Sequence, residues 1–165
     1  MDNFILALEK SIITESWHTS LVLALTMPDI CSKYCYPEQP INKIRYSDWF
    51  NDYVLIKYTS QIGPDHNEHT FLTGNDCYAL RCSLLHEGQS QISHQRSQDI
   101  LDDFVFVQPP KFGNTVHCNL IDEKLQLQID VFSHDILQSC KEWWNVLSDE
   151  DKQAINLKLL KLYKL

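Results

Sequence analysis

Arg81 and His86 are the residues of this chain whose types and spacing best suit phosphate or acid–base chemistry. An arginine offers several N–H donors to a phosphate, and a histidine titrates near neutral pH. Both lie in a largely apolar helical stretch, where at ~100° per residue they stand ~140° apart and share a broad surface without stacking neatly. An unpaired arginine is costly in such a helix, so Arg81 is expected to face a cleft, a carboxylate or a partner subunit.

A structural role is the alternative for the same two residues. Arg81 would pair with an internal Asp or Glu, and His86 would cap the C-terminal end of its helix. Histidine is common at that position because its positive form interacts well with the helix dipole. On residue types alone this structural alternative is favoured.

Cysteine and metal chemistry have weaker signals. Cys77 lies in the first turn of the same helix, where the dipole lowers a thiol pKa, but no base accompanies it and a packing role is favoured. Structural zinc sites use closely spaced cysteine pairs, and this chain has no Cys-x-x-Cys. We therefore expect no metal and no cofactor. The candidate ligands considered were Cys31 with Cys35, His117 with Cys118, and Asp65 with His66 and His69.

Composition indicates one soluble domain over residues 1–165. The chain is 44% hydrophobic and 22% charged, with 22 acidic against 14 basic residues and a net charge of −8. That charge disfavours duplex-DNA binding, which depends on neutralising phosphates. The start lacks a cationic signal-peptide region, and no apolar run reaches the ~18 residues of a membrane span. We expect a cytoplasmic protein with reduced thiols and no membrane partner.

Apolar periodicity predicts helices in the first half of the chain. Thr73 with Asp76 resembles a capping box, and Gly88 is placed to end the helix that follows. Met27-Pro28-Asp29 is expected to stop the first helical region, because the residue before proline resists the helical conformation. The predicted segments are helical residues 3–26 with a break at 14–16, a helix over 47–58 capped by Ser47, a polar loop over 59–72, and a helix from 73 to 88.

In the second half of the chain the spacing of apolar residues first changes to the alternation of strands and then returns to the helical pattern. After a polar stretch at residues 89–99 we expect a strand at 104–107, a hairpin of residues 115–121 and 124–129 around Asp122-Glu123, a helix over 130–147, and a last helix from Ser148 to the end. The fold class is mainly α (α+β): a helical bundle with a small antiparallel sheet or hairpin in the C-terminal half. Its parts are a helical region 1–90, a hairpin region 100–130 and C-terminal helices 131–165.

The stretch from Leu72 to Gly88, with Arg81 followed five residues later by His86, resembles the final-helix motif of the HEPN superfamily. Residues 21–31 and 45–50 are similar to a group of uncharacterised bacterial HEPN-like proteins. The resemblance covers about residues 3–90. It implies a helical bundle that dimerises so that the Arg and His of both subunits meet in one cleft.

Active HEPN proteins are metal-independent endoribonucleases, frequent in toxin–antitoxin, abortive-infection and CRISPR-associated systems. By resemblance, Arg81 would neutralise the scissile phosphate, and His86 would move protons to or from the 2′-OH and the leaving 5′-oxygen. The expected partners are a second copy, an RNA substrate and an antitoxin or other protein.

A non-catalytic module of HEPN type, which binds a protein or a nucleotide, is the alternative. Many active members have a polar residue directly after the Arg, and this chain has Cys82. The acidity and the Trp143-Trp144 pair also favour it, because aromatic residues are enriched in interface cores. Burial of both tryptophans within one subunit is the competing interpretation.

Overall fold

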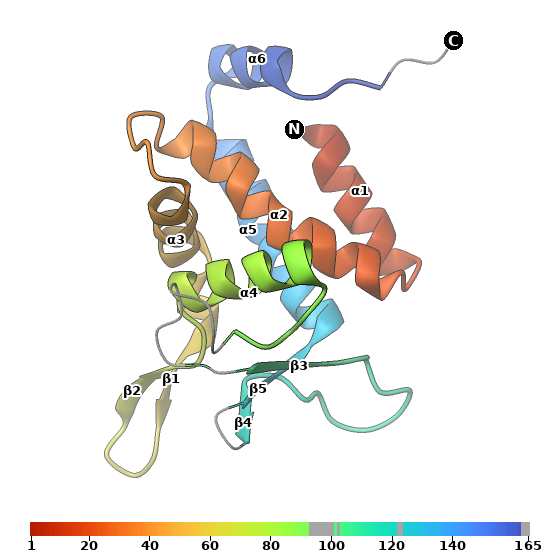
Figure 1. Ribbon diagram of the computed structural model, residues 1–165, viewed down its shortest axis with the longest axis vertical. Coiled ribbons are helices and arrows are strands. Elements are labelled where there is room, and N and C mark those ends of the chain that lie inside the picture. The colour runs from red at the N-terminus through yellow and green to blue at the C-terminus, as the bar shows by residue number, and fades with distance from the viewer. Residues whose placement is uncertain (93–100, 102, 122–123, 163–165) are drawn as a thin grey trace.

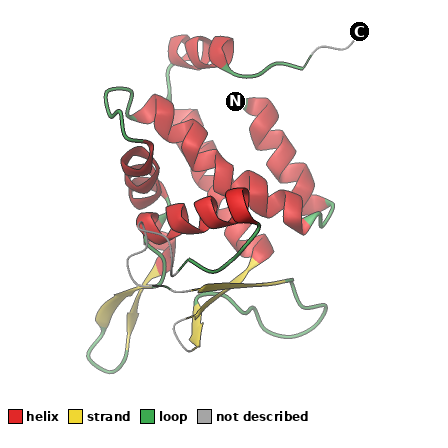
Figure 2. Ribbon diagram, viewed as in Figure 1, coloured by secondary structure: helices red, strands yellow, loops and turns green. Residues whose placement is uncertain are grey.

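The computed structural model describes residues 1–92, 101, 103–121 and 124–162. Helices form most of this part, with a two-stranded and a three-stranded sheet at one end (Figures 1 and 2). The mainly α, α+β class predicted from the sequence is therefore confirmed. The elements are α1 (Asp2–Ile13), α2 (Trp17–Cys35), α3 (Asn42–Tyr53), the 3-10 helix η1 (Leu55–Tyr58), β1 (Thr59–Ile62), β2 (Asn67–Thr70), α4 (Gly74–Glu87), β3 (Asp103–Val107), β4 (Asn119–Ile121), β5 (Lys124–Gln128), α5 (Ile129–Val146) and α6 (Asp149–Lys158).

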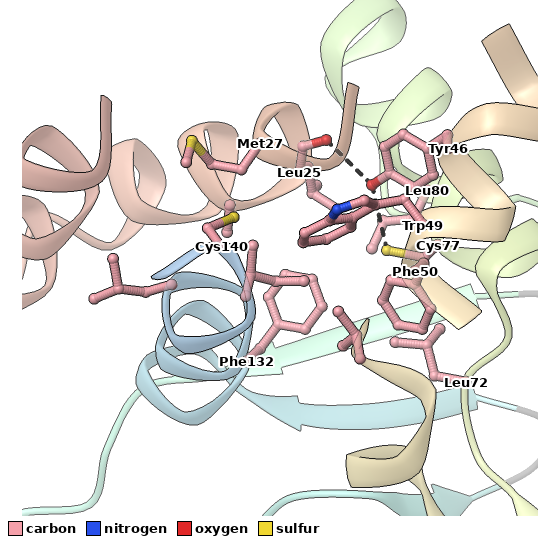
Figure 3. Close-up of a cluster of buried hydrophobic side chains, with 14 of the residues drawn as sticks. Leu25, Met27, Tyr46, Trp49, Phe50, Leu72, Cys77, Leu80, Phe132 and Cys140 are labelled. Carbon is pink, nitrogen blue, oxygen red and sulfur yellow. Dashed lines mark hydrogen bonds between the residues drawn. The ribbon is translucent and has the colours of Figure 1, made fainter. Parts of the chain in front are cut away.

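Helix α2 is the centre of the bundle, because it packs against α1, α3, α4 and α5. Large aromatic side chains from α3 fill the space between these helices, and Trp49 and Phe50 are fully buried there (Figure 3). The Tyr46 hydroxyl enters the same core and donates to the Leu25 carbonyl oxygen at 3.1 Å, so its polar atom is satisfied. Since α5 also packs on α1, the bundle needs helices from both ends of the sequence and is not confined to residues 1–90.

Helix α2 continues through Pro28 to Cys35, so the expected stop at residues 27–29 is wrong. Proline inside a helix costs about 3 kcal/mol through a lost hydrogen bond and a clash with the preceding turn. Met27 and Cys31 flank it and are fully buried against the core. Burying one large apolar side chain contributes about 1.5–3 kcal/mol, so packing on both sides of Pro28 outweighs the local penalty.

Helix α3 begins at Asn42, five residues before the predicted start, and Ser47 lies inside it. The Ser47 hydroxyl is no cap: it donates to Asn75 Oδ1 of α4 at 2.9 Å. The expected polar loop over 59–72 contains a hairpin instead, because β1 and β2 pair antiparallel from Thr59↔Thr70 to Ile62↔Asn67. Its side chains are mostly exposed, so the sequence lacks the alternation of apolar residues by which a strand is recognised.

The three-stranded sheet is mixed, whereas the sequence predicted an antiparallel one. The hairpin of β4 and β5 is confirmed, but β3 pairs parallel with β5, which lies in the middle. Residues 108–118 cross the end of β5 to reach β4, and β4 runs back antiparallel to β5, so the crossover that the parallel pair requires includes β4. Most of the polar stretch 89–99 and the turn residues 122–123 lie outside the described residues.

Helices α5 and α6 confirm the two predicted C-terminal helices, although α6 ends at Lys158 and residues 163–165 are not described. Trp143 and Trp144 are both buried, and the Trp144 indole N–H donates to Asp2 Oδ1 at 3.0 Å. The use of this pair as an exposed contact surface is therefore wrong. Within the described ranges, no helix combines the length and the apolar character needed to cross a bilayer.

Gly74 fixes how closely α4 approaches α3. A Cβ at this position would lie 2.4 Å from the Ser47 carbonyl oxygen and 2.8 Å from its Cα, so backbone would have to move. We expect Gly74→Ala to lower the free energy of unfolding by about 2–3 kcal/mol. Gly88→Ala is the control: its left-handed φ of 70° is strained, but nothing lies within 4 Å, and a cost of about 1 kcal/mol is expected. Equal losses in urea unfolding would contradict the steric argument.

Candidate functional site

Helix α4 carries both predicted site residues, and its ends form as the sequence predicted. The Thr73 hydroxyl accepts from the Asp76 backbone N–H at 3.1 Å, and Gly88 ends the helix in the left-handed conformation. The N–H groups of Gly88 and Gln89 donate to the carbonyls of Leu84 and Ser83, which closes the helix end through backbone. The carbonyls of Leu84 and Ser83 thus have backbone partners, and among the described contacts the His86 side chain meets Arg81 and no carbonyl of the helix end.

Asp29 of α2 holds the guanidinium of Arg81. Arg81 Nε donates to Asp29 Oδ2 at 2.8 Å, and the side chains are only 20% and 15% exposed. The other carboxylate oxygen, Oδ1, accepts from Asn42 Nδ2 at 2.9 Å. Burial by itself would lower the pKa of Arg81, but the attraction of the Asp29 carboxylate outweighs it and raises the pKa. The expected pairing of Arg81 with an internal acid is therefore confirmed, and its partner is Asp29.

The far edge of the same guanidinium reaches His86. Arg81 Nη1 and His86 Nε2 lie 3.2 Å apart. Because a guanidinium has no acceptor, Arg81 is the donor of this hydrogen bond and Nε2 the acceptor, a role open to the neutral ring with its proton on Nδ1. The long arginine side chain bridges the separation around the helix, so the two residues meet more closely than their angular spacing suggests.

Cys82 and Tyr78 border this pair. The Cys82 side chain interacts with both Arg81 and Tyr78. The pKa of the Tyr78 phenol is raised, mainly by burial and to a smaller extent by the neighbouring Cys82 thiol. The site is consequently an Asp29–Arg81–His86 chain with a thiol and a phenol at its edge. It lies on the surface. Three hollows formed by described residues, with volumes of about 250 to 620 Å³, have neither Arg81 nor His86 in their walls.

Cys77 is a packing residue. Its side chain is fully buried, and its sulfur lies 3.4 Å from the Tyr46 hydroxyl (Figure 3). Burial raises the pKa of the Cys77 thiol to about 12, which outweighs any effect of the helix dipole. The candidate role as a nucleophile is therefore not supported.

The candidate metal ligands are dispersed. The buried Cys31 sulfur lies 3.7 Å from Cys140 of α5, whereas His66 is exposed in the turn between β1 and β2. Within the described ranges, no three His, Cys, Asp or Glu side chains are grouped as a metal ion would require.

A second polar cluster, which the sequence did not reveal, joins η1, α5 and the segment before β4. The buried Tyr58 hydroxyl donates to Asp135 Oδ2 at 3.2 Å, and His117 Nε2 lies 4.0 Å from the same oxygen. His117 Nδ1 accepts from the Gln128 backbone N–H at 3.3 Å. Burial lowers the pKa of His117 and raises that of Asp135, because both charged forms lose contact with water. These contacts tie the mixed sheet to the bundle. No single residue pattern could indicate them, because the three side chains are far apart in sequence.

The chain matches no family model, no curated protein and no solved structure. The interpretation of the site therefore depends on its residues and geometry.

The Asp29–Arg81 pair should contribute measurably to stability. We expect a double-mutant cycle of Asp29→Asn and Arg81→Gln to give a coupling energy of about 1–2 kcal/mol in urea unfolding. The control is the pair Glu9–Lys141, which is 2.6 Å apart but 38% and 35% exposed; there we expect less than about 1 kcal/mol. A coupling no larger than the control would contradict the structural importance of the Asp29–Arg81 pair.

The burial of Cys77 predicts its reactivity. With a thiol pKa of about 12 and no exposed surface, Cys77 should resist iodoacetamide at pH 8 in the folded protein and react once the chain is unfolded in urea. Peptide mass spectrometry gives the extent of labelling, with the partly exposed Cys82 as the internal control. Labelling of Cys77 before Cys82 in the folded state would contradict the packing role.

Proposed function

We propose that this chain is a metal-independent endoribonuclease of HEPN type, with a composite active site built from Arg81 and His86 of two copies. One observation carries the proposal: the guanidinium of Arg81 is fixed on one edge by Asp29 and lies 3.2 Å from a histidine on the other. A toxin or phage-defence effector, controlled by an antitoxin or another protein partner, is the biological role that the resemblance implies.

Arg81 is suited to bind the scissile phosphate. A guanidinium has five N–H donors, more than the contacts with Asp29, His86 and Cys82 require. The bond from Nε to Asp29 orients the group and would remain when a phosphate arrives. The bond to the exposed, neutral His86 is the easier one to exchange, because a charged acceptor binds a guanidinium more strongly. Asp29 is thus a positioning residue.

His86 then supplies the proton transfers. Once the phosphate occupies Arg81, the neutral ring can accept the proton of the 2′-OH through Nε2 as the 2′-oxygen attacks phosphorus. The bond to the 5′-oxygen breaks, and a protonated His86 from a second copy donates to the leaving oxygen. The products are a 2′,3′-cyclic phosphate and a 5′-OH. DNA lacks the attacking 2′-OH and would not be cleaved.

The need for a second copy of the chain follows from the number of proton-transferring groups in one subunit. One subunit presents a single His86, whereas the reaction needs a base and an acid at the same moment. A two-fold axis beside α4 would supply both and bring a second Arg81 guanidinium to the phosphate. It would also enclose a site that is open in one subunit.

A non-catalytic module that binds a protein or a nucleotide is the second candidate. The Asp29 carboxylate neutralises the charge of Arg81 in the free chain, and Cys82 replaces the polar residue of many active members. A nucleotide phosphate could displace His86 from Arg81 without any subsequent chemistry.

Cleavage of a labelled single-stranded RNA in EDTA tests the proposal. We expect Arg81→Ala and His86→Ala to lower kcat by at least about a hundredfold, and Asp29→Asn to lower it less. His18→Ala is the matched control, because His18 is an exposed histidine of α2 outside the site. We expect it to leave the rate unchanged, a DNA of the same sequence to stay intact, and the product to carry a cyclic phosphate.

A measurement of the solution mass of the protein shows whether it is a dimer and completes the experiment. A dimer that loses cleavage in both site variants supports the composite nuclease. Activity that survives His86→Ala, or that disappears in EDTA, contradicts it. A folded wild-type protein that binds a nucleotide through Arg81 but cleaves no RNA supports the second candidate.

A further inference from the structure

Residues 152–165 differ in charge from the rest of the chain. This segment contains four lysines and no acidic residue, so it carries +4, whereas the remaining residues carry −12 to give the net −8. Five leucines are interleaved with these lysines, at 157, 159, 160, 162 and 165. Such a separation of charge within one chain indicates a segment with a partner of its own.

Part of the segment belongs to the fold. In α6, Ile155 is buried and Asn156 Oδ1 accepts from the amino group of Met1, and Leu159, directly after the helix, packs against the core. These contacts fix α6 and residues 159–162 at the end of the molecule opposite to the sheets, beside the start of α1 (Figure 1). The position of the segment on the body is therefore defined.

The other leucines do not serve the core. Leu157, Leu160 and Leu162 are 70%, 75% and 92% exposed. Leu160 and Leu162 also line a hollow of about 620 Å³, together with Phe4 and Leu23. Burying these side chains against an apolar partner would remove a large area from water, and nothing in the described part of the chain does so.

Lysines accompany these leucines. Lys158 and Lys161 are exposed, and neither forms an ion pair with a described residue. Asp2 of α1 lines the same hollow as Lys161, and its Oδ1 accepts from the Trp144 indole N–H. The nearest acidic side chains on α6 are in its first turn, at Asp149 to Asp151, about 10 Å of helix from Lys158. That distance is close to the Debye length at 0.1 M salt, so the lysines can attract anions despite the acidic body.

We propose that residues 157–162 bind the surface of a bilayer that contains acidic phospholipids. Lys158 and Lys161 are interspersed among the exposed leucines in sequence, so an apolar protein groove that took up the leucines would also have to accommodate two charged groups. A bilayer surface accommodates them, because leucines enter the acyl boundary while lysine stems extend their ammonium groups to the headgroups. RNA would use the lysines but has no place for three exposed leucines.

This binding is interfacial. It requires no spanning helix, and the expectation of no membrane partner rests on the lack of a spanning stretch alone. The proposal is also independent of the proposed nuclease, because neither Arg81 nor His86 takes part in it.

Co-sedimentation with vesicles tests the proposal. Wild-type protein should bind vesicles of phosphatidylcholine with phosphatidylserine and bind phosphatidylcholine alone much less. Lys158→Gln with Lys161→Gln should weaken binding about thirtyfold, since each lysine near an anionic surface contributes about fivefold. Leu160→Ser with Leu162→Ser should weaken it by more than about tenfold.

Matched controls alter two lysines or two apolar residues elsewhere. Lys33→Gln with Lys111→Gln alters two exposed lysines outside the segment, and Ile13→Ser with Ile56→Ser alters two exposed apolar residues, of α1 and η1. Both should bind as wild type does. Circular dichroism melts confirm that each variant is folded.

Three results would overturn the proposal. The first is equal binding to both kinds of vesicle, and the second is weakened binding in the controls as well as in the segment variants. The third is a lack of vesicle binding by wild type; a concentration-dependent mass that Leu160→Ser with Leu162→Ser abolishes would then assign the leucines to a second copy.

Discussion

The ion pair between Asp29 and Arg81 is the interaction on which the candidate site depends. It joins the central helix α2 to α4, and both side chains are too buried for either charge to stand alone at low cost. Asn42 occupies the second carboxylate oxygen, so the acid cannot rotate away from the guanidinium. Arg81 then donates to Nε2 of His86, which accepts this hydrogen bond in the neutral ring. Three helices thus position the guanidinium that His86 contacts.

The same pair determines how the site meets an anion. With Asp29 attached, Arg81 contributes little net charge, and an acidic chain of −8 does not attract a polyanion from a distance. Binding would depend on short-range exchange, in which a phosphate displaces the neutral His86 while Asp29 stays. That exchange couples phosphate binding to release of the base, so His86 becomes available only when the substrate phosphate is present. The nuclease and the nucleotide-binding module share this first step and differ only in whether a second copy supplies the acid.

Local signals in the sequence were sufficient for the ends of α4, for α5 and for the hairpin of β4 and β5, because each depends on residues close in sequence. Arg81 and His86 could be chosen for the same reason. Asp29 could not, since its relevance depends on α2 continuing past Pro28, where core packing outweighs the preference of proline. The parallel pairing of β3 with β5 and the Tyr58–Asp135 contact are likewise long-range. Tertiary contacts, not local propensity, therefore account for the elements that were missed.

The proposed nuclease site on α4 and the proposed bilayer-binding residues 157–162 are placed so that both can operate in one molecule. Helix α4 lies between α6 and the sheets, so a bilayer that contacts residues 157–162 at the α6 end would leave α4 uncovered (Figure 1). The acidic remainder of the chain, at −12, would be repelled by the same acidic headgroups that attract the lysines. Attraction at one end and repulsion along the body favour a single orientation, with the sheets directed away from the lipid. A dimer with its axis beside α4 would then have to place both leucine-rich segments on one side, and this geometric condition links the two proposals.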